Sequence, residues 1–156
     1  MDTLLITRDD LDADGVYTRA ESIDYAGHVE ISADLGTVRV RGGVRATGRI
    51  RCLSGSGIKA GRSIEAGWSV VAGGSVEAGE SVEAGGSVEA GWSVEAGGSV
   101  VAGGSIVARF LSVRLRIFAG LVAWRLPEPS ECEVRAEIRS GTLAHGTHVA
   151  PVEVKS

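Results

Sequence analysis

A six-residue unit is copied without interruption through the middle of the chain and limits the fold more than any other feature. In GGSVEAGWSVEAGGSV (residues 85–100) a valine recurs every six residues, and alanine follows it two residues later. Such short-period self-similarity is typical of a solenoid, in which each unit stacks on its neighbours. The same register holds at nine aliphatic positions: Ile58, Ile64, Val70, Val76, Val82, Val88, Val94, Val100 and Ile106.

The unit is predicted to be a strand and not a helix. Residues i and i+2 share one face of an extended chain, so each Val–Ala pair points inward and the residue between them points to solvent. A glycine in every unit would cost a helix about 1 kcal/mol each time. The Gly-x pair is expected at the corner, where glycine adopts backbone conformations closed to other residues.

These units predict an all-β fold, a single-stranded β-solenoid (β-helix) with about three hexapeptide sides per turn and about five turns. Downstream of the repeat, Val113, Leu115 and Ile117 alternate with arginines and are expected to point inward. The chain is expected to comprise an entry segment (1–22), the β-solenoid (23–117, with regular hexapeptides at 57–108), and a C-terminal cap with possible dimerisation strands (118–156).

The C-terminal segment has its own pattern. FAGLVAWRL, residues 118–126, is apolar and suits a cap. Cys132, Val134, Ala136 and Ile138 then share one side of an alternating strand, which predicts a half-buried strand. The sequence THVAPVEV offers a second strand. Such a tail is expected to pack on the flank of the solenoid or to pair across a two-fold axis.

With three sides per turn, the outward residues form three columns. Two of these columns change from basic to acidic along the stack, and Arg114 is expected above Glu95. Opposite charges on neighbouring strands offset part of the cost of like-charged neighbours. The predicted columns are Arg39–Lys59–Glu77–Glu95, Arg45–Glu65–Glu83–Val101 and Arg51–Val71–Glu89–Val107.

The units AGGSVE, AGWSVE and AGESVE resemble the hexapeptide repeat of left-handed β-helix proteins, which are often trimeric acyltransferases with a catalytic histidine in a loop. Residues 57–108 contain no histidine and no loop insertion, so the resemblance implies the fold and not the activity. A hexapeptide acyltransferase-like enzyme is a remote alternative. The short V-x-A and V-x-V sides over roughly 38–108 also resemble bactofilins, bacterial β-helical proteins that form cytoskeletal polymers.

Apolar outward residues near the end of the repeat indicate a covered surface, because glutamate is the usual residue there. Either the C-terminal segment or a second subunit would cover it. The first hypothesis is therefore a non-enzymatic structural scaffold that forms a homo-oligomer, with a closed dimer favoured over a filament because of the apolar cap. The candidate residues for self-association and capping are Val101, Val107, Phe110, Phe118, Leu121 and Trp124.

The second hypothesis is a binding module that inhibits or recruits a macromolecular partner through charge. Residues 39–51 carry five arginines and no acid, although the net charge of the chain is −4. The glutamates would mimic a row of phosphates, and the arginines would meet an acidic partner. The residues of these charged faces are Glu77, Glu83, Glu89 and Glu95, and Arg39, Arg45 and Arg51.

Metal, cofactor and membrane signals are weak. Asp10-x-Asp12-x-Asp14-Gly15, with Glu21 at position 12, matches the spacing of a calcium-binding EF-hand loop, but the flanking sequence does not predict helices. An acidic turn is the simpler interpretation. No cofactor, catalytic residue or small-molecule substrate is predicted. No apolar run approaches the length of about 20 residues that a membrane helix needs. The two cysteines form no CxxC pair, which favours the cytoplasm.

Overall fold

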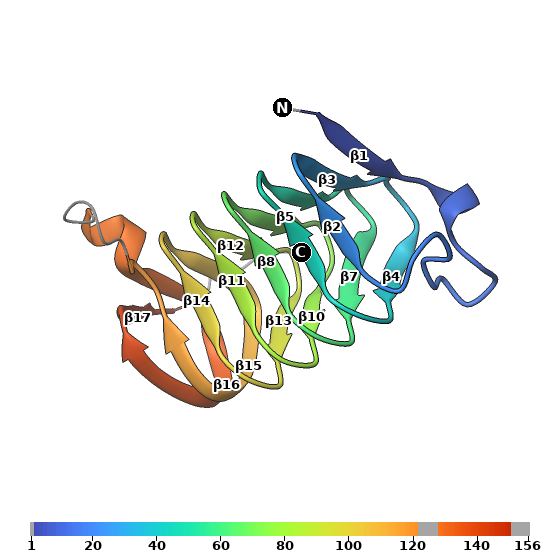
Figure 1. Cartoon of the computed structure of the whole chain (residues 1–156). Coiled ribbons are helices and arrows are strands. Elements are labelled where there is room, and N and C mark those ends of the chain that lie inside the picture. The colour runs from blue at the N-terminus through green and yellow to red at the C-terminus, as the bar shows by residue number, and fades with distance from the viewer. Residues whose placement is uncertain (1, 122–127, 151–156) are drawn as a thin grey trace.

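The computed structural model describes residues 2–121 and 128–150. This chain winds into a parallel β-solenoid of about five turns, with its first strands at one end of the stack and its last strands at the other (Figure 1). The only helical elements among the described residues are two 3-10 segments, η1 (Arg8–Asp10) and η2 (Pro129–Cys132). The predicted all-β solenoid is confirmed.

Each turn has three sides, so the strands form three stacks, which we call faces one, two and three. Neighbouring strands on a face pair in parallel. Face one holds β4 (Gly36–Val40), β7 (Ser56–Ala60), β10 (Val76–Ala78) and β13 (Ser93–Ala96). Face two holds β2 (Ile23–Tyr25), β5 (Val44–Ala46), β8 (Ile64–Ala66), β11 (Val82–Ala84) and β14 (Val100–Ala102). Face three holds β1 (Thr3–Ile6), β3 (His28–Ile31), β6 (Ile50–Cys52), β9 (Val70–Ala72) and β12 (Val88–Ala90).

The spacing of paired residues confirms three six-residue sides per regular turn. Val76 pairs with Ile58, eighteen residues earlier, and with Val94, eighteen residues later. The turns nearer the N-terminus, which we call the lower turns, are longer, since Ile58 pairs with Val38, twenty residues earlier. The longer corner buries Ser56, whose Oγ donates to the Ser32 carbonyl oxygen at 2.5 Å. This hydroxyl also accepts the Leu35 N–H at 3.0 Å, so the extra residues cost no unpaired polar group.

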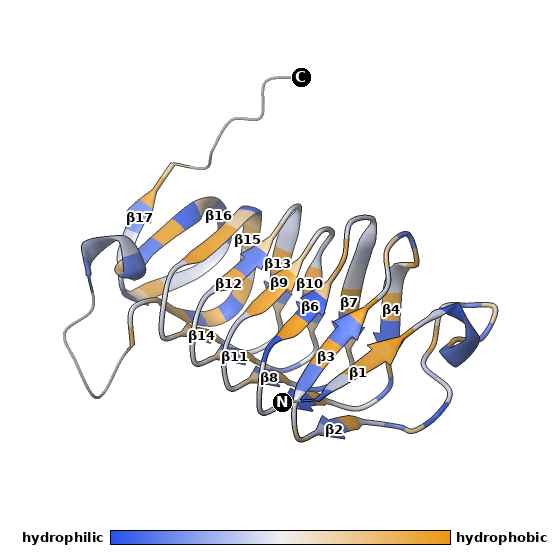
Figure 2. Ribbon diagram, turned by 90° about the horizontal axis from the view of Figure 1, so that it is seen from above, coloured by the Kyte–Doolittle hydropathy of each residue, from blue (hydrophilic) through white to orange (hydrophobic). Residues whose placement is uncertain are grey.

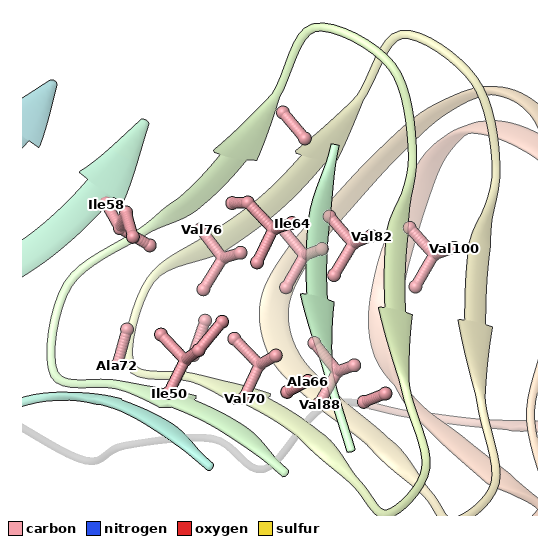
Figure 3. Close-up of a cluster of buried hydrophobic side chains, with 14 of the residues drawn as sticks. Ile50, Ile58, Ile64, Ala66, Val70, Ala72, Val76, Val82, Val88 and Val100 are labelled. Carbon is pink, nitrogen blue, oxygen red and sulfur yellow. The ribbon is translucent and has the colours of Figure 1, made fainter. Parts of the chain in front are cut away.

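The inward Val–Ala pairs build a narrow core along the whole coil. The aliphatic residues of the repeat are fully buried and meet at the centre of the coil (Figure 3). One strand contributes only three residues, so the apolar surface is buried by stacking and not within any single unit. Full burial of one valine or isoleucine stabilises the fold by about 1.5–3 kcal/mol.

The corner glycines are needed for close stacking. Those of the regular turns have no positive φ, so the expectation of a backbone conformation closed to other residues is wrong for them. Instead, a Cβ on Gly85 or Gly103 would lie well under 3.0 Å from the carbonyl oxygen of the glycine one turn below. A side chain at this corner would force neighbouring turns apart.

β15 (Ile106–Phe118) runs along all three faces in a single bent strand. Leu111 pairs with Val94, only seventeen residues earlier, because one corner is a residue shorter than the others. The inward residues after this corner are therefore Leu111, Val113, Ile117 and Ala119, all fully buried. Leu115 is 57% exposed, so the prediction that it points inward is wrong. For the same reason Ser112, and not Arg114, stacks on Glu95.

The stacked strands extend beyond residues 23–117 at both ends. β16 (Glu133–His145) pairs in parallel with β15, and β17 (Thr147–Val149) pairs with the start of β16. Val134 and Ala136 are fully buried, and β16 is banded hydrophobic and hydrophilic (Figure 2). These strands continue the coil, so the expectation that they pack on its flank is wrong. Cys132, expected on the buried side of a strand, is half-buried at the end of η2.

Candidate functional site

The outward residue of each strand stacks on its counterpart one turn away, which gives one column of side chains per face. The three columns predicted from the sequence are present between β4 and β15, apart from the position of Arg114. In the structure they extend further at both ends. On face two, Asp24 precedes Arg45, while Phe118 and then His145 follow Val101.

Face two becomes apolar towards its C-terminal end. Val101 and Phe118 are stacked neighbours, and both are half-buried. Leu115 and Leu121 flank this pair at the two corners of the same side, and they are 57% and 47% exposed. We call these four residues the apolar patch. Below it, the same column carries Arg45, Glu65 and Glu83, so the change from charged to apolar side chains is confined to the upper turns.

The other residues predicted for self-association lie elsewhere. Val107 is on face three, where it stacks between Glu89 and Arg135. Phe110 occupies the shortened corner, with its ring 5.4 Å from that of Trp92 and the Arg139 guanidinium 3.7 Å above its centroid. Trp124 lies outside the described residues.

Sequence reasoning missed Leu115 as an outward residue, although a signal was present. The segments IVA, LSV and IFA (106–108, 111–113 and 117–119) are three aliphatic-x-aliphatic sides in succession. Read in this way, they leave Arg114, Leu115 and Arg116 for the corner. The alternation of Val113, Leu115 and Ile117 masked this pattern. A continuous strand and two strands separated by a corner both place Val113 and Ile117 inward, and they differ only at Leu115.

Two pairs of stacked glutamates lie on faces one and two. A hydrogen bond shared with Glu95 raises the pKa of Glu77, and partial burial and the charge of Glu95 add to this effect. Partial burial, with smaller contributions from Glu65, raises the pKa of Glu83. Arg45 lies below the second pair, with its Nε 3.9 Å from a Glu65 carboxylate oxygen.

The glutamates proposed to mimic phosphates lie in three separate columns, as the sequence predicts. Glu77 and Glu95 stack on face one, Glu83 lies on face two and Glu89 on face three. The turn has eighteen residues, so consecutive six-residue units are directed to different faces. Arg39, Arg45 and Arg51 are likewise one on each face, and together they form a basic belt around one turn.

The acidic residues near the N-terminus use their carboxylates to fold the entry loop. The Asp10 carboxylate accepts the Thr7 N–H and an Arg19 side-chain hydrogen bond, and these contacts hold its pKa below the usual value. Asp12 Oδ1 accepts the N–H groups of Asp14 and Val16 at 2.9 and 3.0 Å. In the described part of the chain, no three His, Cys, Asp or Glu side chains form a group suited to a metal ion.

A shallow groove runs along the corner beside face two, with a volume of about 530 Å³. Its floor is made of alanine and glycine, including Ala66, Gly67 and Gly85, and Val101 closes its upper end. A second groove of about 290 Å³ follows the corner beside face one and is lined by Lys59, Glu77 and Glu95 among others. Both grooves exist because the residues at these corners have little or no side chain.

Comparisons with known proteins identify no relative of this chain. Neither the family models, nor the curated proteins, nor the solved structures include a match to it. Within residues 2–121 and 128–150, no helix has the length and apolar character needed to cross a membrane.

Proposed function

We propose that this protein is a non-enzymatic structural scaffold that forms a homodimer through the apolar patch. The observation that carries this proposal is the stacking of Val101 and Phe118, flanked by exposed Leu115 and Leu121, on a face that is charged in its lower turns. Apolar side chains gathered on one part of a protein surface typically mark a protein–protein interface.

A second copy is the partner that the patch fits most simply. The patch lies near the C-terminal end of face two, with His145 stacked beyond Phe118. Two copies related by a two-fold axis through the patch bring Val101 and Phe118 of each chain against the same residues of the other. The charged side chains lower on the face, such as Glu83, then lie at the rim of the interface, where water solvates them. A closed pair results, with both copies using the same surface.

Charge substitution within the patch tests this proposal. We expect Phe118→Glu, and separately Val101→Glu, to convert the dimer to a monomer, because both place carboxylates at the centre of an apolar contact. Light scattering over a concentration series at high salt gives the molar mass, and circular dichroism shows that the fold is retained. The control is Val107→Glu, which introduces the same charge on face three and should leave the dimer intact. Equal loss of the dimer in all three variants would contradict the role of the patch.

A further inference from the structure

Face one carries an ordered set of charges that differs from those on the other two faces. Its column runs Arg39, Lys59, Glu77, Glu95, so two bases are followed by two acids on four successive strands. Stacked strands are about 4.8 Å apart, which places the four charges along roughly 14 Å of a flat sheet face. Arg39, Lys59 and Glu95 are exposed, and Glu77 is half-buried.

Within one chain this order is unfavourable. It places Arg39 next to Lys59 and Glu77 next to Glu95, and like charges on neighbouring strands repel each other. A hydrogen bond shared with Glu95 raises the pKa of Glu77, with smaller contributions from partial burial and from the charge of Glu95. The other faces begin with acid–base neighbours, Asp24 with Arg45 and Glu30 with Arg51. On face one, only the central neighbours Lys59 and Glu77 carry opposite charges.

Two copies of this column that run in opposite directions match each base of one copy with an acid of the other. We infer that face one is a second self-association surface, on which another copy of this chain packs with its coil axis antiparallel. A two-fold axis along the strand direction, between β7 and β10, sets Arg39 opposite the partner's Glu95 and Lys59 opposite the partner's Glu77. Symmetry repeats both contacts, which gives four ion pairs between the two chains.

The surroundings of the column suit such a contact. Beyond Glu95 the column continues with two serines, Ser112 and Ser140, and Val16 lies beyond Arg39. In the antiparallel arrangement, the partner's Ser112 lies opposite Val16, so neither of these two positions of the column places a charge against the other. The groove beside face one leaves room for the long Arg, Lys and Glu side chains to tilt towards their partners.

This interface depends on charge and is distinct from the apolar patch. Exposed ion pairs are individually weak and are screened over about 10 Å at 0.1 M salt, so the contact is expected at low salt and high protein concentration. The patch lies on face two, and its association does not depend on salt. Phe118→Glu is expected to abolish association through the patch, so the variants of face one are made in the Phe118→Glu protein, which serves as their parent.

Two variants with the same column composition separate the charge order from the charge content. Lys59→Glu with Glu95→Lys makes the order base, acid, acid, base, which is symmetric, so like charges meet in an antiparallel pair. Lys59→Glu with Glu77→Lys makes the order alternate, which stays complementary on reversal. Both variants keep two bases and two acids in the column and leave the net charge unchanged.

Sedimentation velocity over a concentration series at low and high salt measures the association of these variants and their parent. We expect the dissociation constant of the symmetric variant to rise by about tenfold or more, since four attractive pairs become repulsive. The alternating variant should associate at low salt as the parent does, and high salt should abolish both. Equal association of the parent and the symmetric variant would overturn the inference. A parent that stays monomeric at low salt would also overturn it and leave face one to solvent or to a different partner.

Discussion

At the scale of the residue, the main constraint on this chain is the distance between stacked turns. The first glycine of each regular corner lies against the backbone of the preceding turn, and the residue after it varies among Gly, Glu, Arg and Trp. Adjacent positions in the same corner therefore differ sharply in what they tolerate.

Substitution of the two glycines in one corner shows this difference. Gly103→Ala should destabilise the fold by about 1–3 kcal/mol, because its Cβ would overlap the Gly85 carbonyl oxygen. Gly104→Ala should cost much less, because its Cβ approaches only the Ser87 Oγ closely, at 2.8 Å, and that side chain can rotate. Urea unfolding of both variants measures the difference. Equal loss of stability would show that close stacking does not explain the first glycine.

The two cysteines should react differently with thiol reagents. Burial raises the pKa of the Cys52 thiol to about 12, so almost no thiolate is present in the folded protein near neutral pH. Cys132 is only half-buried. We expect one thiol per native chain to react readily and the second to react after unfolding. A Cys132→Ser variant that still reacts quickly in the native state would contradict the buried position of Cys52.

At the scale of the element, the short strands and their columns could be predicted from the sequence, and the last turns could be predicted only in part. The regular units place Val76 and Glu77 without ambiguity, because nine copies share one register. In β15, Val113 and Ile117 were correctly predicted to point inward, but Leu115 was predicted to point inward with them because the alternation of the three residues masks the corner at Arg114, Leu115 and Arg116. The apolar patch was predicted in part, through Val101, Phe118 and Leu121, but Leu115 was assigned to the core.

A pair of leucines in β15 tests the corrected register. Leu111 is fully buried, so Leu111→Ala should destabilise the fold by about 2–5 kcal/mol. Leu115 is largely exposed, so Leu115→Ala should change stability by no more than about 0.5 kcal/mol. The midpoint of thermal unfolding distinguishes them. A larger effect at Leu115 would restore the register in which Leu115 points inward.

The stacked glutamates should make the fold more stable as the pH falls from neutral towards 4.5. The pKa values of Glu77 and Glu83 are raised in the folded state, so the native chain binds protons more readily than the unfolded chain, and stability decreases as the pH rises through this range. Urea unfolding at several pH values measures the slope. Glu77→Gln with Glu83→Gln should flatten it, and an unchanged slope would contradict this assignment.

At the scale of the whole molecule, the coil presents three flat faces with different surface chemistry. Face two carries the apolar patch, and face one carries two bases followed by two acids. Face three mixes charged residues with Val71 and Val107. This division follows from the eighteen-residue turn, which brings every third unit onto the same face. A simple repeat thus produces a scaffold on which surfaces can be varied independently of the core.

The molar mass of the unmodified protein at high salt, measured by light scattering over a concentration series, tests the central claim most directly. Salt screens the charged column of face one but not an apolar contact. A dimer whose mass does not increase further with concentration is the predicted result. A monomer at every concentration would contradict self-association through the apolar patch, and open-ended growth would contradict its closure into a pair.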